Sequence, residues 1–398
     1  MLVAVRLLGV VALSALSALG VAAPTKDPVS PPGHGGLPST FRVEVVAKNL
    51  TIPWSMVFLP DGRMLFTERH GNLNVLDVSN GLPAVPQPIT GVPLVASVEE
   101  SGLLGIALHP DYAENGWLYL YYTYALPSGV FQNRVERFRL DGDALVDGTI
   151  IIDGIPGFPN HDGGRIRFGP DSMLYICTGE TGQRARAQDL TFLGGKILRV
   201  RDDGSIPFDN PFGSNSPVWT LGHRNPQGID FDPRSGLLYE TEHGPSTGDG
   251  PPGGDEINII DKGLNYGWPL IHHRMTAPGL VSPLLEYTPA VAPSGGSFYT
   301  GTKLPFWRDN FFFACLRGRD LHRLVLHPTN RRRVLSDTVL FNGAFGRLRD
   351  VITGPDGFLY ICTSNRDGRG QPVPDDDRIL RIVPNNRGVR SVKPEIVE

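Results

Sequence analysis

Cysteine is scarce in this chain, which has three cysteines in 398 residues. Cys177, Cys315 and Cys362 all lie in apolar, strand-like runs, and their spacing excludes a cysteine-based metal motif. We therefore expect three buried thiols, although a chain exported to an oxidising compartment could still form one disulfide.

Neither sign of charge is in large excess. The formal net charge is −4, and the charged residues, 20% of the chain, mix both signs along the sequence. There is no basic stripe of the kind that binds nucleic acid and no polybasic patch for a membrane surface. With 40% hydrophobic residues, the composition is that of a globular protein with a large core.

No stop-transfer flank follows the long apolar run at the N-terminus. Residues 1–23 carry an early Arg6, then an apolar stretch and small residues, which is the layout of a signal peptide cleaved after Ala22 or Ala23. A membrane anchor is the alternative. We expect a secreted or periplasmic protein without a stable anchor, beginning with a disordered proline- and glycine-rich leader at residues 24–38.

Glycine (48) and proline (36) are abundant, which favours short strands and tight turns, and hence an all-β fold. A turn followed by an apolar strand recurs along the chain. The intervals between the turn prolines are 50, 60, 63 and 122 residues, so we expect one more copy in the last interval, at Pro293. The five visible turn prolines are Pro60, Pro110, Pro170, Pro233 and Pro355.

Six such repeats predict a six-bladed β-propeller of four-stranded antiparallel blades, because each sheet buries its faces only by stacking on its neighbours. The propeller should span residues 39–384. Alternating residues 41–47 and 378–383 should pair in one blade and so close the ring. A loose tail, residues 385–398, should follow.

A hairpin is expected between residues 161 and 180, where apolar positions alternate on both sides of a Gly-Pro-Asp turn. His161 enters the hairpin and Glu180 leaves it, so the two side chains can lie within hydrogen-bond distance. An imidazole oriented by a carboxylate is the arrangement that a general base needs. The alternative is a turn histidine and a solvated glutamate.

Two groups of residues that contain arginine also lie at expected loop ends. Arg224 and Asn225 precede a proline turn, where they could hold an anionic or carbonyl group. Arg347 and Arg349 point the same way from a strand, and with Arg317 of the neighbouring repeat they could bind a polycarboxylate. Solvated arginines with separate ion pairs are the alternative.

Two long inserts, residues 200–217 and 244–256, should be loops on the functional face. The second combines carboxylates, glycines and prolines, which suits a hard cation such as calcium bound partly through backbone carbonyls. Its spacing does not match an EF-hand, so the loop alone is a weak indication of metal.

Several long runs, in order from about residue 53 to 383, resemble those of the quinoprotein sugar dehydrogenases, which use pyrroloquinoline quinone (PQQ) and are six-bladed propellers. The runs are GLLGIALHPDY, HDGGRIRFGPD, GKILRV with DGSIPFDNPF, LGHRNPQG, GDEINII with GLNYGWP, and GRLRDVITGPDG. The resemblance implies an enzyme that oxidises aldoses at the anomeric carbon to lactones by hydride transfer to PQQ.

The resemblance also implies catalytic roles. His161 matches the family's general base, and Glu180 stands where the family has an aspartate that holds this histidine. Arg224 and Asn225 match the pair that contacts the quinone oxygens and stabilises the developing negative charge.

Further matches concern cofactor and metal binding. Arg347 and Arg349 match the arginines that bind the carboxylates of PQQ, Arg317 replaces a lysine, and Glu100 replaces a glutamine that contacts the cofactor. Gly244 and Pro245 match the backbone carbonyls that hold calcium against the quinone, although a second pair, Gly250 and Pro251, leaves the alignment ambiguous.

Two other functions fit an exported propeller of this kind. One is a recognition module related to hedgehog-interacting proteins, without redox chemistry, and the other is a calcium-dependent lactonase. Retention of a base, a carbonyl-polarising pair and a carboxylate clamp favours the enzyme. Thr288 and Ala290 are small where related enzymes place aromatic residues near the sugar, so we expect an open pocket with broad aldose use and an electron acceptor still to be identified.

Overall fold

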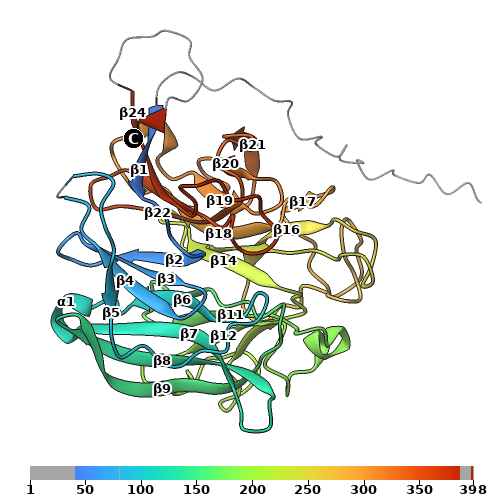
Figure 1. The fold of residues 1–398 in the computed structure, drawn as a ribbon. Helices are drawn as coiled ribbons and strands as arrows, with labels where there is room; N and C mark the ends of the chain where they lie inside the picture. The colour runs from blue at the N-terminus through green and yellow to red at the C-terminus, as the bar shows by residue number, and fades with distance from the viewer. Residues whose placement is uncertain (1–40, 80, 386–395, 398) are drawn as a thin grey trace, which may run out of the picture.

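The structure is a computed structural model that describes residues 41–79, 81–385 and 396–397. The chain forms a ring of six antiparallel sheets (Figure 1). The predicted six-bladed, all-β propeller is therefore confirmed. The signal peptide and leader predicted for residues 1–38 lie outside the described residues. Among the residues described, no helix has the length and apolarity needed to cross a membrane.

Each blade contains four strands in the order of the sequence, and the first strands of successive blades contact one another around the central axis. The first three blades are β2 (Pro53–Phe58), β3 (Met64–Glu68), β4 (Asn72–Leu76) and β5 (Gln87–Ile89); β6 (Leu103–Leu108), β7 (Trp117–Ala125), β8 (Phe131–Asp141) and β9 (Ala144–Pro156); and β10 (Ile166–Phe168), β11 (Leu174–Thr178), β12 (Lys196–Val200) and β13 (Val218–Leu221).

The next two blades follow the same pattern, and short helical turns occur only in connections within the described residues. The strands are β14 (Pro226–Phe231), β15 (Leu238–Glu242), β16 (Asp255–Ile260) and β17 (Leu285–Tyr287); and β18 (Pro293–Phe298), β19 (Phe311–Cys315), β20 (Asp320–Leu326) and β21 (Val334–Leu340). The turns are α1 (Tyr112–Asn115), η1 (Arg184–Gln188) and η2 (Pro305–Trp307).

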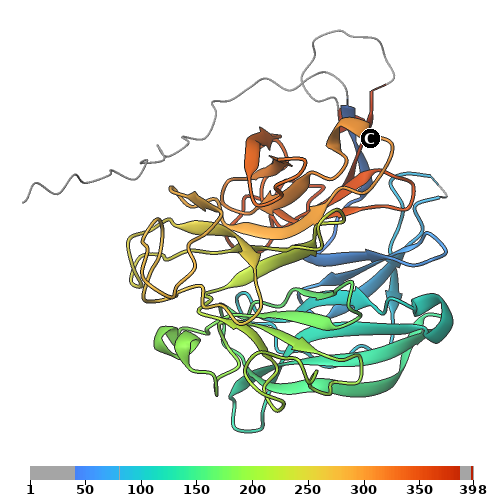
Figure 2. The same cartoon turned by 180° about the vertical axis from the view of Figure 1, so that it is seen from behind.

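The sixth blade joins the two ends of the propeller. It consists of β22 (Leu348–Thr353), β23 (Leu359–Thr363), β24 (Ile379–Pro384) and β1 (Phe41–Ala47), with Val43 opposite Ile382. Figures 1 and 2 show blue β1 beside red β24 from both sides, so the predicted closure is confirmed. In the tail predicted to be loose, β25 (Ile396–Val397) pairs in parallel with β1.

One detail of the repeat was wrong. In five blades the turn proline lies between the first and second strands, as the repeat predicts, but Pro293 begins the first strand of its blade. The matching turn, residues 299–310, is longer and contains Pro305 in η2. Pro293 corresponds instead to Pro226, which also opens a first strand.

The prediction that both long inserts lie on one face was also wrong. Successive connections of antiparallel strands alternate between the two ends of the strands, and in a propeller these ends lie on opposite faces of the ring. Residues 243–254 follow the second strand of their blade, whereas residues 201–217 follow a third strand and lie on the opposite face. There Asp202 accepts a hydrogen bond from the Tyr119 hydroxyl at 3.0 Å, close to the turn before β7.

Apolar clusters between adjacent blades form the core. Alternate strand residues face the neighbouring sheet, and each fully buried large side chain contributes about 1.5–3 kcal/mol. One cluster joins the first three blades through Trp54, Leu104, Tyr119, Tyr121, Ile166, Ile176 and Leu198. The three cysteines are free and buried, as predicted.

Candidate active site

A polar cavity of about 470 Å³ lies on the face formed by loops that precede first strands and follow second strands. Nine of the residues singled out from the sequence line it: Glu100, His161, Arg224, Gly244, Pro245, Ala290, Arg317, Arg347 and Arg349. Glu180 and Asn225, both fully buried, are outside this lining. The structure thus gathers residues from five blades around one cavity.

His161 sits on the cavity wall just before β10, and its Nδ1 lies 2.5 Å from Oε1 of Glu180. The β10–β11 hairpin brings the two together, as the sequence predicts. His161 has φ 61°, a left-handed conformation that is uncommon for residues other than glycine and is often found at functional sites. Gly179 permits this arrangement, because a Cβ there would lie 1.9 Å from the His161 carbonyl oxygen.

Glu100 supports the same histidine through the backbone. Its Oε2 accepts a hydrogen bond from the His161 N–H at 3.2 Å, and its Oε1 forms an ion pair with Arg369 at 2.5 Å. Burial by itself would raise the pKa of Glu100, but Arg369, His161 and His243 lower it to about 2. Glu100 is therefore an anion at neutral pH that fixes the strained His161 backbone.

Arg224 projects from the loop before β14 and is held by the long loop after β15. Its Nε and Nη2 lie 2.9 and 2.7 Å from Oδ2 of Asp249, and its Nη1 donates to the His243 carbonyl at 3.3 Å. Asn225 lies behind it, where its Oδ1 accepts the Gly163 N–H at 3.1 Å. Arg224 can therefore face a ligand directly, whereas Asn225 organises the wall.

Arg347 and Arg349 converge on one carboxylate. Nε and Nη2 of Arg347 lie 2.9 and 2.8 Å from Oδ2 of Asp367, and Nη2 of Arg349 lies 3.8 Å from the same oxygen. Burial lowers the pKa of Arg349 to about 10, which leaves it charged at neutral pH. Arg317 lines the same cavity from the loop after β19, so the three arginines of the predicted cluster face one cavity.

Sequence reasoning missed Arg69 and His243, which also line the cavity. Each directly follows the second strand of a blade, at the end of the similar runs FTER and ETEH. Aligning these runs would have found both residues. Asp367 and Arg369, from the loop after β23, also line the cavity but belong to no repeated run.

Two further groups on the wall have displaced pKa values. Burial raises the pKa of Asp162 to about 7, against hydrogen bonds from Asn133 and the Phe158 N–H. Burial lowers the pKa of His243 to about 3, and Arg224 adds to this effect. His243 is therefore neutral at pH 7, and the lasting positive charge of the cavity comes from its arginines.

The expected calcium residues, Gly244 and Pro245, lie on the wall beside Arg224. The loop is closed by the Gly253 N–H, which donates to the Pro245 carbonyl at 3.2 Å, and by Asp255, which accepts the Gly244 N–H at 2.8 Å. Among the described residues, no group of three metal-ligating side chains lies at this pair. A metal here would depend on backbone carbonyls, water and a bound ligand.

Of the two small residues expected near the sugar, one lines the cavity. Ala290 is part of the wall, whereas Thr288 accepts the Gly254 N–H at 2.9 Å and so supports the loop from behind. Ala290 leaves space beside the arginines that an aromatic side chain would fill.

Comparisons with known proteins agree with this geometry. The chain matches the family model described as Glucose / Sorbosone dehydrogenase over residues 50–380. It is 36% identical over 371 residues to aldose sugar dehydrogenase YliI of Escherichia coli, covering 88% of this chain and 94% of that protein. The PQQ-bound form of aldose sugar dehydrogenase from Streptomyces coelicolor is 36% identical, with a TM-score of 0.76, over 87% of this chain and 99% of that one.

A weaker similarity bears on the alternative function, a recognition module related to hedgehog-interacting proteins. Mouse hedgehog-interacting protein is 27% identical over 209 residues, which cover 46% of this chain and 30% of that protein. The family model and the aldose sugar dehydrogenases cover most of the chain instead. The chain therefore belongs to the glucose/sorbosone dehydrogenase family of sugar oxidoreductases.

Proposed function

We propose that this protein is a PQQ-dependent aldose sugar dehydrogenase that oxidises the anomeric carbon of aldoses to give lactones. The observation that carries the proposal is the His161–Glu180 pair on the wall of an arginine-rich cavity. A module that only binds a partner has no physical reason to keep a buried carboxylate behind a histidine. The PQQ-bound relative from Streptomyces coelicolor supports the choice of cofactor.

The arginines of the cavity fit a polyanionic cofactor. Nε of Arg69 and Nε of Arg349 are buried without a hydrogen-bond partner among the described residues. Buried donors without partners cost free energy, and carboxylates of a bound PQQ would satisfy them. Arg347 and Arg349, which already share Asp367, would hold these carboxylates together with Arg69.

The chemistry of the chain's own residues follows from the hydrogen bond at Nδ1 of His161. Because the Glu180 carboxylate accepts at Nδ1, the imidazole keeps its proton there and presents Nε2 as the basic atom. Nε2 removes the proton of the anomeric hydroxyl. A bound PQQ would supply the acceptor for the hydride that leaves the anomeric carbon.

Arg224 would stabilise the negative charge that develops on the group accepting the hydride, since its guanidinium is buried and held in place by Asp249. The backbone carbonyls of Gly244 and Pro245 would hold calcium, whose positive charge would add Lewis-acid polarisation. Thr288 fixes the neighbouring Gly254, which keeps this loop in position.

The proposal is tested by reconstituting purified apoprotein with PQQ and calcium and measuring reduction of an artificial electron-accepting dye with a panel of aldoses. We expect turnover with several aldoses and none when PQQ is left out. A protein that binds PQQ but reduces no dye with any aldose would contradict an enzymatic role.

We also propose that the protein is exported, on the basis of the signal-peptide layout of residues 1–23. Mass spectrometry of the secreted or periplasmic fraction should find a mature N-terminus directly after Ala22 or Ala23. Full-length protein confined to the cytosol would contradict export.

A further inference from the structure

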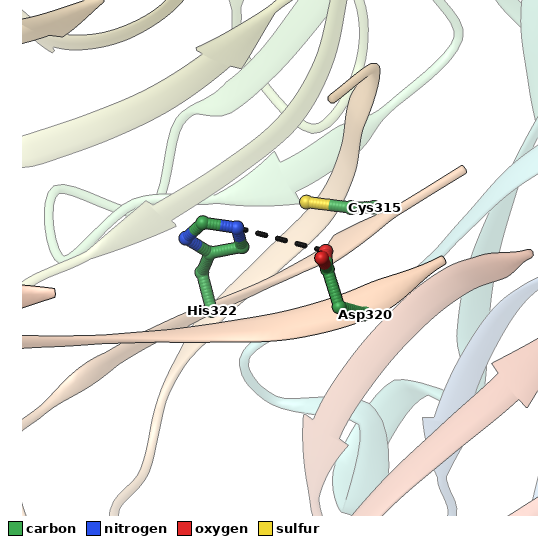
Figure 3. Close-up of side chains that lie close together, drawn as sticks. All are labelled: Cys315, Asp320 and His322. Atoms are coloured by element: carbon green, nitrogen blue, oxygen red, sulfur yellow. Dashed lines mark ion pairs between the residues drawn. The ribbon is translucent and has the colours of Figure 1, made fainter. Parts of the chain in front are cut away.

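A second cluster of reactive side chains lies in the fifth blade, outside the proposed catalytic machinery. Cys315 ends β19, and Asp320 begins β20 directly opposite it. His322 follows two residues later on β20 and so projects from the same face as Asp320. The register of one strand pair therefore places a thiol, a carboxylate and an imidazole together (Figure 3).

The three potential ligand atoms of Cys315, Asp320 and His322 lie within 4.8 Å of one another. Nε2 of His322 is 3.6 Å from Oδ1 of Asp320, and Figure 3 shows the Cys315 side chain beside this pair. Tetrahedral zinc with ligand bonds of about 2.0–2.1 Å needs about 3.3 Å between nitrogen and oxygen. The observed distance between Nε2 of His322 and Oδ1 of Asp320 needs to shrink by only a few tenths of an ångström.

The surroundings of His322 match those of a metal-bound histidine. Its Nδ1 lies 2.8 and 2.9 Å from the two oxygens of Asp337, which itself accepts a hydrogen bond from the Tyr287 hydroxyl at 2.8 Å. Ligating histidines typically donate their other ring N–H to a carboxylate, which fixes the tautomer and the ring orientation. Asp337 thereby assigns Nε2, the atom nearest Asp320, as the free ligand.

The burial of these three side chains is a second, independent indication of a metal site. Cys315 is fully buried, Asp320 and His322 are 8% and 4% exposed, and Oδ1 of Asp320 has no hydrogen-bond partner among the described residues. A buried carboxylate oxygen without a partner is costly. One Zn²⁺ bound by a thiolate, a carboxylate and a neutral imidazole would form a site without net charge.

We propose that Cys315, Asp320 and His322 form a zinc site, with Asp337 as the residue that orients His322. Binding releases the Cys315 thiol proton as the zinc–sulfur bond forms, and no electron transfer is involved. The mixed sulfur, nitrogen and oxygen ligand set favours zinc over calcium, which takes only oxygen ligands. The site lies at the base of the β19–β20 turn, whose residues Leu316 and Arg317 line the cavity.

The test uses the mature protein loaded with PQQ, in buffer with excess calcium, so that oxygen-ligand sites are occupied before zinc is added. Calorimetric titration should find one zinc per chain. Co²⁺ in place of zinc should give the absorption of a thiolate-to-cobalt charge transfer. Asp337→Asn should weaken zinc binding about 10- to 100-fold, the usual effect of changing a residue that orients a ligand.

Cys177→Ser is the matched control for Cys315→Ser, because Cys177 is also a fully buried strand cysteine but belongs to no such cluster. The cobalt absorption should disappear in Cys315→Ser and remain in Cys177→Ser. The competing arrangement is a protonated His322 between two carboxylates, which binds no metal. Absence of stoichiometric zinc, or equal zinc affinity in both serine variants, would overturn the site.

If Cys315→Ser does not fold, X-ray absorption spectroscopy of the zinc-loaded parent protein decides the question. One sulfur in the zinc coordination shell supports the site, and a shell of oxygen and nitrogen alone refutes it. The result is independent of sugar oxidation, since no step of the proposed reaction uses these residues.

Discussion

His161→Ala should abolish the fast chemical step while leaving PQQ binding almost intact. The variant removes the proposed base but none of the arginines proposed to hold the cofactor. A lost general base costs about 10²- to 10⁴-fold in rate, or about 2.7–5.5 kcal/mol of transition-state stabilisation. We therefore expect the bound quinone to be reduced by an excess of aldose at least ~100-fold more slowly than in the parent protein.

Glu180→Gln should cost less, because the amide oxygen can still accept from Nδ1 of His161. A hydrogen bond to a charged group contributes about 1.5–3 kcal/mol, against about 0.5–1.5 kcal/mol for a neutral one. The difference of about 1 kcal/mol predicts a rate roughly 5- to 10-fold below that of the parent protein. His70→Ala, at an exposed histidine outside the cavity lining, is the control and should keep the parent rate.

Rapid-mixing absorption spectroscopy of PQQ-loaded protein separates cofactor binding from cofactor reduction. The order of rates should be parent and His70→Ala, then Glu180→Gln, then His161→Ala. If His161→Ala reduced its bound quinone as fast as the parent, the assignment of the base would be refuted, and a binding propeller with an incidental cofactor pocket would become the better account.

Three other results are expected. Chelator-treated protein should lose PQQ binding and regain it when calcium is restored; undiminished binding, with no metal found by elemental analysis, would remove calcium from the mechanism. Arg347→Ala or Arg349→Ala should weaken PQQ affinity by about 1.5–3 kcal/mol in fluorescence titrations, and unchanged affinity in both would mean that these buried arginines do not hold the cofactor. Because folding raises the pKa of Asp162 from 3.8 to about 7, the folded state retains a proton that the unfolded state releases. The free energy of unfolding of the parent protein, measured with urea, should fall by up to ~4 kcal/mol between about pH 4 and pH 7, and that of Asp162→Asn should not. The same pH dependence in both proteins would contradict the raised pKa of Asp162.

The fold could be predicted because each blade repeats the same local pattern. A turn, an apolar strand and a spacing of about one blade suffice to count the sheets, and alternation at both ends shows that residues 41–47 complete the last blade. The position of Pro293 could not be resolved in this way. Its blade has a turn of twelve residues, 299–310, so a proline at the start of a strand resembled the missing turn.

The faces of the two inserts were missed for a different reason. The face of a loop depends on whether it follows the second or the third strand of a blade. Residues 201–217 follow β12, a third strand, but the sequence alone does not mark β10 and β12, of three and five residues, clearly enough to count them. Composition indicated that both segments were loops, and only strand order assigns them to opposite faces.

The residues of the candidate site also differ in how well they can be predicted from the sequence. His161 and Glu180 could be paired from sequence because one hairpin carries both, which makes their contact local. The supports of the other residues come from distant parts of the chain: Arg349 Nη1 donates to Gln227 Oε1 at 3.1 Å across 122 positions, and Arg369 reaches Glu100 across 269. No local pattern contains such a pairing.

These long-range contacts separate the support of the proposed base from the loop that carries Ala290. The backbone of His161 is fixed by Glu100 from the second blade, and Glu100 in turn pairs with Arg369 from the sixth. The proposed base is thus held across the ring by residues that lie outside the loop carrying Ala290. Substitutions at Ala290 should therefore change which sugars fit, and hence KM, while the pairing of His161 with Glu180 and the rate of proton removal stay the same.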